Sequence, residues 1–353
     1  MSKKNIYIVG FGWASLGFLK EIDTTAYNIY IISKSDTFYY TPLLAQNIKH
    51  SHKTTFDIHK VINHNKAIHL IKDEVTTIDF EKNRISTNNT NATFDYIILS
   101  HGSCVNTFNI EGVEEHCNFI KTDEDSKKIK QQLIQLPSNS KIIVVGCGLT
   151  GSEIIGTLID YNKFKVYAID ALPLPLASFD KTISNMALDL WKQHSVKIYL
   201  NTIVSKIEKN TIQFKNEKEA LSFDMIIWCA GIKISPLSEK INKILKLDCN
   251  KGIPVNNYLQ IKNTSNAFAM GDCAFSGNPP TAQVAYQQGQ YLAKRFNTHF
   301  TKKQEFVFDN KGQIGYIGKN QAVFQNNYFK TGGNITHYLN MGFRAYQLYT
   351  LQK

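Results

Sequence analysis

Two glycine-rich stretches of one kind, Gly10-Phe11-Gly12-Trp13-Ala14-Ser15 and Gly146-Cys147-Gly148-Leu149-Thr150-Gly151, decide the fold of this 353-residue chain. Each follows a short apolar, β-branched run (6–9 and 141–145), and each leads into an apolar-periodic stretch that predicts a helix. Glycines between a strand and a helix let the backbone approach a pyrophosphate, whose charge is favoured at a helix N-terminus. Two such motifs predict an α/β fold with two Rossmann-like domains, two bound dinucleotides and electron transfer between them.

The second half of each unit repeats as well. An apolar strand predicted at 94–100 enters a turn at His101-Gly102, and another at 223–229 enters a turn at Ala230-Gly231. This internal repeat indicates that the two units share one fold. The chain then returns to the first unit through residues 267–273, which have a buried-strand pattern that ends in Gly271-Asp272.

Further elements are expected around this frame. They are strands at 28–32 and 165–169, helices at 16–22, 154–158, 283–297 and 335–351, a loop at 38–44, a β-rich region at 67–87 with a hairpin at 88–91, and a β-rich segment at 305–329.

Charge and targeting signals narrow the class of protein. The net charge of +11 comes from lysines spread along the chain, without a run of five basic residues, which argues against nucleic-acid binding and weakly favours an anionic membrane surface. No apolar run reaches the roughly 18 residues of a spanning helix. The first strand begins close to Met1, so no signal or transit peptide is expected. We expect an intracellular protein, either cytosolic or peripherally bound to a membrane.

The six cysteines (Cys104, Cys117, Cys147, Cys229, Cys249 and Cys273) are scattered. Flavoprotein disulfide reductases need two thiols close in sequence, and this chain has no such pair. Metal-ligand spacing is absent too, so no metal site is predicted. Buried free thiols in a reducing compartment are expected instead.

The two dinucleotide units differ after their second strand. Asp170 stands where a carboxylate binds the ribose hydroxyls, and its charge would repel a 2′-phosphate, so NADH is favoured over NADPH; the alternative is an ordinary exposed loop aspartate. The first unit has Ser33-Lys34 there, and Ser15 replaces its third glycine. Both departures are tolerable for FAD, whose ribityl chain could be bound by Gly271-Asp272.

These motifs resemble alternative (type II) NADH dehydrogenases, single-chain flavoproteins that pass electrons from NADH to a membrane quinone without pumping protons. The resemblance covers about residues 4–333. It is carried by Gly-Phe-Gly-Trp-Ala (10–14), Phe-x-x-Thr-Pro-Leu-Leu (38–44), the stretch 105–117, Gly-x-Gly-x-Thr-Gly-x-Glu (146–153), Ala-x-Gly-Asp-Cys-Ala (269–274) and Pro-Pro-Thr-Ala-Gln-Val-Ala-x-Gln-Gln-Gly (279–289).

The resemblance implies a role for each matching position. FAD would be bound by Gly10, Gly12, Ser15, Ser33, Lys34, Thr41, Pro42, Gly102, Gly271 and Asp272. NADH would be bound by Gly146, Gly148, Gly151, Asp170 and Gly231. Glu153 would lie beside the nicotinamide, unless it is only a first-turn glutamate that favours the helix dipole. Gln283 and Gln287, four residues apart on one helix, would line the quinone site.

We therefore expect three parts: a discontinuous FAD domain (1–121 and 233–302), an NADH domain (122–232) and a C-terminal segment (303–353) in contact with a membrane or a second subunit. Family members normally continue with amphipathic membrane-docking helices, whereas this sequence ends at Lys353. The last helix could face a membrane through Ile335, Tyr338, Leu339, Tyr346 and Tyr349, with Phe343, Leu348 and Leu351 close by, or it could pack on the protein.

Two other functions stay open at this point. One is a soluble NAD(P)H-dependent flavoprotein whose acceptor is a small quinone, a dye, oxygen or a partner protein. The other is a non-catalytic regulator that binds flavin or NADH. A homodimer is compatible with all three functions.

Overall fold

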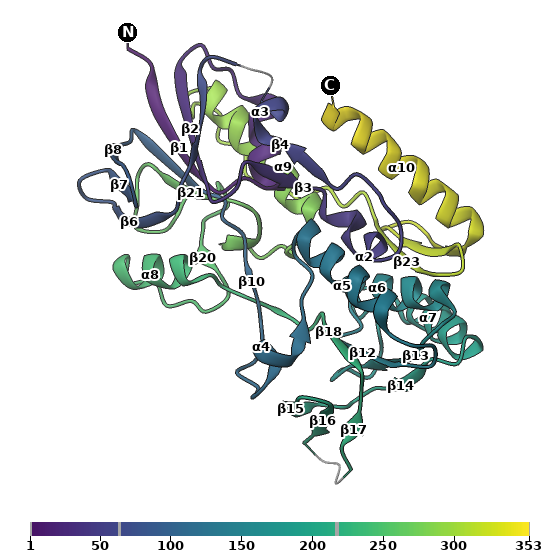
Figure 1. Cartoon of the computed structure of the whole chain (residues 1–353). Coiled ribbons are helices and arrows are strands. Elements are labelled where there is room, and N and C mark those ends of the chain that lie inside the picture. The colour runs from purple at the N-terminus through teal and green to yellow at the C-terminus, as the bar shows by residue number, and fades with distance from the viewer. Residues whose placement is uncertain (1, 63–64, 216–218, 353) are drawn as a thin grey trace. The chain divides into compact units, whose positions relative to one another are not determined.

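The computed structural model describes residues 2–62, 65–215 and 219–352, and the side chains of all of these except Tyr349 and Gln352 (Figure 1). The chain forms two compact units. Unit 1 comprises residues 1–38, 56–104 and 232–309, and unit 2 comprises residues 39–55, 105–231 and 310–353. Three short strands span the points of passage: β3 (Thr37–Tyr39), β4 (Thr55–Asp57) and β10 (Cys104–Val105).

Unit 1 is built on a five-stranded parallel sheet of order β21-β9-β1-β2-β5. The central strand β1 is buried along its second half, which explains its uninterrupted apolar sequence. The elements of this unit are β1 (Lys4–Val9), α1 (Trp13–Glu21), β2 (Tyr27–Ser33), α3 (Ile58–Val61), β5 (Ile68–Lys72), β6 (Val75–Asp79), β7 (Arg84–Thr87), β8 (Asn91–Thr93), β9 (Tyr96–Leu99), β19 (Ile232–Lys233), α8 (Pro236–Ile244), β20 (Ile253–Pro254), β21 (Ala267–Ala269), η2 (Gly271–Cys273), β22 (Ala274–Phe275) and α9 (Ala282–Asn297).

Unit 2 contains a second five-stranded parallel sheet, of order β11-β18-β12-β13-β14. Its elements are η1 (Thr41–Leu43), α2 (Leu44–Asn47), α4 (Val113–His116), β11 (Cys117–Asn118), α5 (Asp123–Gln135), β12 (Lys141–Val145), α6 (Leu149–Tyr161), β13 (Lys165–Ile169), α7 (Lys181–Gln193), β14 (Lys197–Tyr199), β15 (Val204–Glu208), β16 (Thr211–Phe214), β17 (Leu221–Ser222), β18 (Met225–Trp228), β23 (Gln313–Gly318), β24 (Gln321–Gln325), β25 (Lys330–Gly333) and α10 (Asn334–Gln352).

The two sheets have the same plan. In each, the strand before the glycine motif (β1 or β12) lies between the strand that follows the first helix (β2 or β13) and the strand that closes the unit (β9 or β18). Each unit also carries a three-stranded antiparallel sheet, β6-β7-β8 or β15-β16-β17. The predicted fold class, with two Rossmann-like units that share one fold, is confirmed.

The local expectations differ from the structure at several places. Residues 38–44 form the end of β3, the 3-10 turn η1 and the first residue of α2, because Pro42 fits the first turn of a helix. The last sheet starts at Gln313 and ends at Gly333, later than predicted at both ends. Helices α5, α7 and α8 were not predicted, although Thr122, Asp180 and Ser235 are helix N-cap residue types that mark their starts.

The units and the predicted domains are divided differently. Residues 39–55 and 105–121 belong to unit 2 by their contacts, and the C-terminal segment divides between the two units at residue 309. The predicted domains were defined by the cofactor that each would bind, so that assignment stays a prediction.

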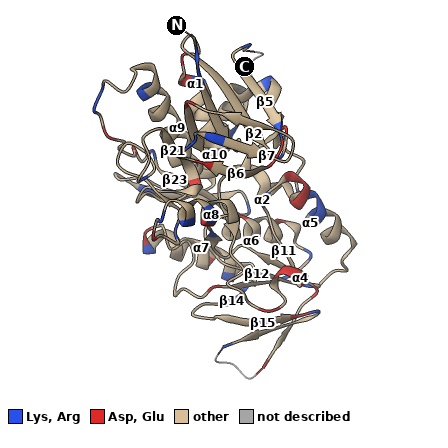
Figure 2. Cartoon of the chain, turned by 90° about the vertical axis from the view of Figure 1, so that its left-hand side faces the viewer, with Lys and Arg blue, Asp and Glu red and all other residues tan. Residues whose placement is uncertain are grey.

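In the view of Figure 2, the lysines and arginines are spread over many separate segments of the ribbon. Within the described part of the chain, no helix combines the length and the apolar character needed to cross a membrane.

Candidate functional site

The first glycine turn connects β1 to α1 in unit 1. Gly10 has φ +95°, and a Cβ there would lie 2.6 Å from the Ser100 carbonyl oxygen and the His101 Cα. Gly10 therefore has to be glycine. Gly12 is the N-cap of α1, and a Cβ there would meet nothing within 4 Å. The space in front of the helix N-terminus is open to a ligand at that point.

Ser15 replaces the third glycine without a clash. Its buried hydroxyl donates to the Gly10 carbonyl oxygen at 2.9 Å and lies 3.0 Å from the Ser100 hydroxyl. At the matching position in unit 2, a Cβ on Gly151 would lie 1.8 Å from the Gly146 carbonyl oxygen. The first turn therefore has room for a side chain at this position, whereas the second does not, and the Ser15 hydroxyl links the turn to α1.

Ser33 and Lys34 follow β2, where a dinucleotide fold often has an acid. The Ser33 hydroxyl accepts from the Ser35 amide at 3.4 Å, and the Lys34 ammonium forms an exposed ion pair with Glu74 at 2.6 Å. Both contacts are local to the surface of unit 1.

The returning strand β21 brings Gly271 and Asp272 to the same sheet edge of unit 1. Asp272 Oδ2 accepts from the Ser103 hydroxyl at 3.4 Å, next to Gly102, which has φ +72° and open space at its Cβ position. The Gly271 amide donates to Gln288 Oε1 at 2.7 Å.

Two residues at this edge were missed by the sequence analysis. The buried Gln288 of α9 also donates to the Ser276 hydroxyl at 2.9 Å, so its amide holds the turn around Gly271. His101 Nε2 lies 2.9 Å from the Ser238 hydroxyl, and burial lowers the pKa of this histidine to about 4. Gln288 stands within the quoted 279–289 motif, whereas no local signal distinguishes His101.

The second glycine turn connects β12 to α6 in unit 2. Gly146 has φ +91°, and a Cβ there would lie 2.6 Å from the Ala230 amide nitrogen. Gly148 is the N-cap of α6, and its Cβ position is again open. Gly231 has φ +69° and follows β18, at the same sheet edge as Gly146.

Among the longer helices α1 and α5 to α9, the N-termini separate into two groups. The four helices α5, α7, α8 and α9 are capped by side chains that accept from first-turn amides, those of Thr122, Asp180, Ser235 and Thr281. In contrast, α1 and α6 begin at glycines, which offer no side chain for this purpose. A helix begun in this way presents its amides to an anion. Both predicted dinucleotide positions therefore fit a pyrophosphate.

Asp170 follows β13 and is only partly buried. Its Oδ2 accepts from the Cys147 amide at 2.6 Å and its Oδ1 from the Leu172 amide at 2.8 Å. The carboxylate thus stabilises the glycine turn, and its contact with a ribose stays a prediction. Each carboxylate oxygen can accept a second hydrogen bond, for example from a ribose hydroxyl.

Glu153 lies in the second turn of α6 and is buried. Its Oε1 is 2.7 Å from Nη2 of Arg344 in α10, and the Tyr316 amide donates to the same oxygen at 3.5 Å. Burial raises the pKa of Glu153, and the Arg344 guanidinium opposes that rise. The alternative of a first-turn, dipole-stabilising glutamate is therefore wrong.

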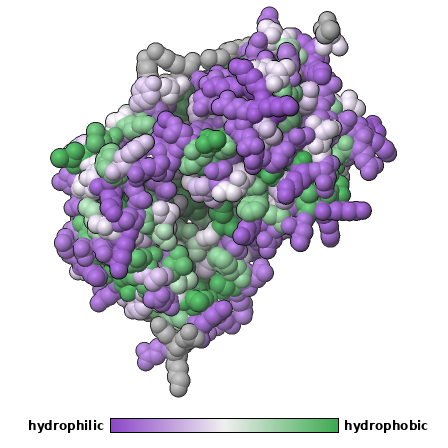
Figure 3. Space-filling view, turned by 180° about the vertical axis from the view of Figure 1, so that it is seen from behind, coloured by the Kyte–Doolittle hydropathy of each residue, from purple (hydrophilic) through white to green (hydrophobic). Residues whose placement is uncertain are grey.

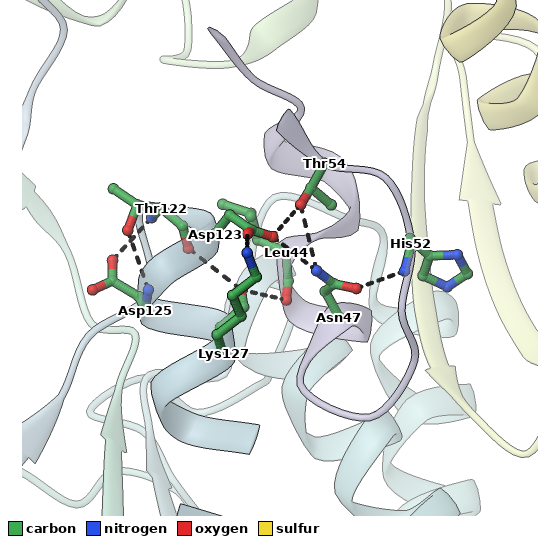
Figure 4. Close-up of polar contacts among 9 residues, drawn as sticks. Leu44, Asn47, His52, Thr54, Thr122, Asp123, Asp125 and Lys127 are labelled. Carbon is green, nitrogen blue, oxygen red and sulfur yellow. Dashed lines mark hydrogen bonds and ion pairs between the residues drawn. The ribbon is translucent and has the colours of Figure 1, made fainter. Parts of the chain in front are cut away.

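Thr41 and Pro42 lie on the segment 39–55, which a polar network fixes to α5 within unit 2 (Figure 4). The network centres on the buried carboxylate of Asp123, which accepts from the Thr54 hydroxyl, from Asn47 Nδ2 at 3.0 Å and from the Lys127 ammonium at 2.6 Å. Figure 4 shows these side chains converging on Asp123 from both chain segments. The predicted flavin-contacting residues thus stand on an anchored segment.

Gln283 and Gln287 lie on α9, and both are partly exposed. The Gln287 amide exchanges two hydrogen bonds with the backbone of Asp309, donating at 2.8 Å and accepting at 3.0 Å. Gln287 therefore has a structural contact in unit 1, and a role toward quinone would have to add to it or replace it.

The six cysteines are free thiols. Burial raises the pKa of Cys117, Cys229 and Cys273 to about 12, which disfavours the thiolate that disulfide exchange requires. Among the residues that the structure describes, no group of three or more histidine, cysteine or acidic side chains is arranged to hold a metal ion.

Comparisons with known proteins agree with this geometry. The chain is 29% identical over 386 residues to a probable NADH dehydrogenase of Dictyostelium discoideum, covering 95% of this chain and 83% of the relative. It is 26% identical over 426 residues to the mitochondrial external NADH-ubiquinone oxidoreductase 2 of Saccharomyces cerevisiae, covering 99% and 75% of the two chains. The resemblance to alternative NADH dehydrogenases is therefore confirmed.

Solved structures show the same fold. NDH2 from Plasmodium falciparum in complex with NADH superposes with a TM-score of 0.88 at 23% identity, over 96% of this chain and 93% of that one. The sulfide:quinone oxidoreductase of Aquifex aeolicus gives 0.85 at 17% identity, over 99% and 91%. A family model described as pyridine nucleotide-disulphide oxidoreductase matches residues 4–289, and the chain belongs to that family.

Proposed function

We propose that this chain is an FAD-dependent NADH:quinone oxidoreductase. The observation that carries the proposal is the pair of glycine-started helices, α1 and α6, at equivalent edges of two sheets of one plan. A chain that holds two dinucleotides in this way is suited to electron transfer between them. The named relatives supply the identity of the donor and acceptor, NADH and ubiquinone.

Unit 1 would hold FAD. The amides at the start of α1 would bind its pyrophosphate, for which the open position at Gly12 leaves room. Gly102, also open at its Cβ position, would lie near the adenosine part, and Asp272 would accept from ribityl hydroxyls. Ser33 and Lys34 are further predicted FAD contacts in unit 1, whereas the predicted contact of Thr41 and Pro42, which belong to unit 2, rests on the resemblance alone. Bound FAD supplies hydride acceptance from NADH and two-electron transfer to a quinone.

Unit 2 would hold NADH. The start of α6 and the open position at Gly148 would accept the pyrophosphate, and Asp170 would bind the ribose while it stabilises the turn. Glu153, buried and paired with Arg344, would orient the nicotinamide by accepting from its carboxamide. Gln283 and Gln287 would donate to the quinone carbonyl oxygens.

Membrane contact and a homodimer are further proposals, supported by α10. The helix packs on β24 and β25, yet Ile335, Tyr338, Leu339 and Tyr346 are exposed. Of the other residues predicted near this face, Phe343 is exposed, Leu351 is buried, and the Tyr349 side chain lies outside the described residues. Hydrophobic side chains also show at the surface in the view from behind (Figure 3). The exposed apolar side of α10 suits a membrane interface.

An anaerobic absorbance titration tests the proposed reaction. Purified protein is titrated with NADH, and a soluble ubiquinone analogue is then added. We expect the oxidised-flavin band to bleach with NADH and to return with the quinone. If the band returns only with oxygen, a dye or a partner protein, then that molecule, and not a quinone, is the electron acceptor. Folded protein that binds no flavin would favour a regulator.

A further inference from the structure

The last helix, α10, presents its polar side chains inward. Thr336, His337, Asn340 and Arg344 are buried, whereas the apolar residues Ile335, Tyr338 and Leu339 are exposed. A helix that packs on a protein body usually has the opposite arrangement. The inward face of α10 is therefore specialised for polar contacts within unit 2.

The central contact of that face is the ion pair between Arg344 and Glu153. Nη2 of Arg344 lies 2.7 Å from Oε1 of Glu153, and the two side chains are 7% and 8% exposed. Arg344 Nε donates to Asn340 Oδ1, one turn earlier in α10, at 2.9 Å. The guanidinium is thus oriented by its own helix and directed at the carboxylate. A charge-assisted hydrogen bond in such buried surroundings orients the Glu153 carboxylate and also favours its ionised form.

Part of the hydrogen-bonding capacity of this pair remains for a ligand. Arg344 Nη1 is buried and has no partner among the residues that the structure describes. Both hydrogen bonds that the carboxylate accepts, from the Tyr316 amide and from Arg344, end on Oε1, and Oε2 takes part in neither. A buried charged donor without a partner is costly, which favours a polar atom of a ligand or a water beside Nη1.

We propose that Arg344 is the positioning residue for Glu153, so that α10 forms part of the NADH half-site. This inference rests on the role proposed above for Glu153 beside the nicotinamide. The Arg344 charge favours the ionised carboxylate against the effect of burial and holds Oε1, which leaves Oε2 to accept from the nicotinamide carboxamide. Without the guanidinium, the pKa of so deeply buried a carboxyl would rise further, and Oε1 would lose the contact that orients it.

Other ionisable groups surround the pair and must be separated from it in any pH experiment. Tyr40 donates to Gln347 of α10, and burial raises its pKa to about 12. Burial lowers the pKa of His52 and of His337, and the Arg344 charge lowers both further. Asp160 accepts from the Tyr316 hydroxyl on the strand beside α10 and acts on His337 in the opposite direction.

The test compares Glu153→Gln, Arg344→Met, Arg344→Lys and the double variant Glu153→Gln/Arg344→Met as FAD-loaded, full-length proteins. Stopped-flow flavin reduction by NADH and the steady-state KM for NADH are measured from pH 5 to 9, together with flavin content and melting temperature. Arg84→Met, at an exposed position in β7, is the matched control. A carboxyl that loses its cation should titrate at higher pH, so the double variant identifies which step in the profile belongs to Glu153.

We expect Arg344→Met to raise the KM for NADH about tenfold and to move one step of the pH profile upward. We expect Arg344→Lys to recover most of the rate, and the double variant to be no slower than the slower single variant. If Glu153→Gln raises KM but Arg344→Met changes neither KM nor the profile, the positioning role is wrong and the function stands. If Glu153→Gln itself changes nothing, the role of Glu153 fails, and that of Arg344 with it.

Discussion

The hydroxyl of Ser15 donates to the carbonyl oxygen of Gly10 at 2.9 Å and thereby ties the start of α1 to the glycine turn before it. The same hydroxyl lies 3.0 Å from that of Ser100, at the end of the neighbouring strand. One buried side chain thus joins the three backbone segments that would surround the FAD pyrophosphate. The equivalent turn in unit 2 has no room for such a side chain at Gly151.

Ser15→Ala should weaken FAD binding. The change leaves the Gly10 carbonyl and the Ser100 hydroxyl without a buried partner, at a cost of about 1–3 kcal/mol. Flavin retained after dialysis and the melting temperature are measured together. Ser152→Ala is the matched control, because the buried Ser152 hydroxyl donates to the Cys147 carbonyl in unit 2. Equal flavin loss in both variants would contradict a role for Ser15 specific to FAD.

Asp170→Asn should reduce the preference for NADH over NADPH by about tenfold, or about 1.4 kcal/mol. Asparagine keeps one acceptor oxygen for the Cys147 amide, loses the acceptor for the Leu172 amide, and removes the charge that would repel a 2′-phosphate. The ratio of kcat/KM for the two nucleotides is the measurement. Asp170→Arg should favour NADPH more strongly. An unchanged ratio in both variants would mean that the carboxylate only stabilises the turn.

Local sequence was sufficient for the parts of the fold whose causes are local. Gly10 and Gly146 need positive φ and leave no space for a Cβ, and such requirements appear directly as glycines between an apolar strand and a helix. Strand β13 occupies the predicted residues 165–169, because a strand buried in a parallel sheet has an uninterrupted apolar sequence.

The contacts that complete the candidate site are not local, and no sequence pattern marks them. Glu153 and Arg344 are separated by 191 residues, and the Asp123–Thr54 contact spans 69. An arginine in a helix with apolar neighbours has the same local appearance whether it points to solvent or to a buried carboxylate. Only the packing of α10 on unit 2 distinguishes these cases.

Gln287→Leu should spare flavin reduction by NADH and slow reoxidation by a soluble quinone. The structure adds a second consequence, because the change also removes two hydrogen bonds to the Asp309 backbone. Both half-reactions are followed by stopped flow. Gln290→Leu is the control, since this amide lies on the same helix and donates to Glu21 at 2.8 Å. Normal reoxidation in the Gln287 variant would mean that Gln287 serves only the structural contact with Asp309 and not the quinone.

Asp123→Asn should destabilise the protein at neutral pH by about 1–3 kcal/mol, because charge-assisted hydrogen bonds are replaced by neutral ones. Burial raises the pKa of Asp123, but hydrogen bonds from Lys127 and Thr54 outweigh that effect and lower the pKa overall. The stabilisation is therefore complete above the unfolded pKa of about 3.9 and is lost as the pH falls through the lower folded value.

Urea unfolding at pH 7 and in steps below pH 4 checks this behaviour. The difference between wild type and Asp123→Asn should shrink on acidification. Asp189→Asn, at an exposed position in α7, should show no such trend. A difference that stays constant with pH would mean that the carboxylate gains nothing from ionisation in the folded state.

Leu339→Glu should detach the protein from membranes without affecting the chemistry at the two dinucleotide positions. Leu339 is 68% exposed on the apolar face of α10, so a charge there should not unfold unit 2. We expect about a tenfold loss of binding to anionic lipid vesicles, since an interfacial helix binds through its buried apolar area. Activity with a long-tailed quinone in those vesicles should fall in parallel, and activity with a water-soluble quinone should be retained. Ile134→Glu, at an exposed position in α5, is the control for an added charge on an apolar surface residue. If Leu339→Glu binds vesicles as wild type does but changes the oligomeric state in sedimentation, the apolar face of α10 serves a second copy of the chain instead.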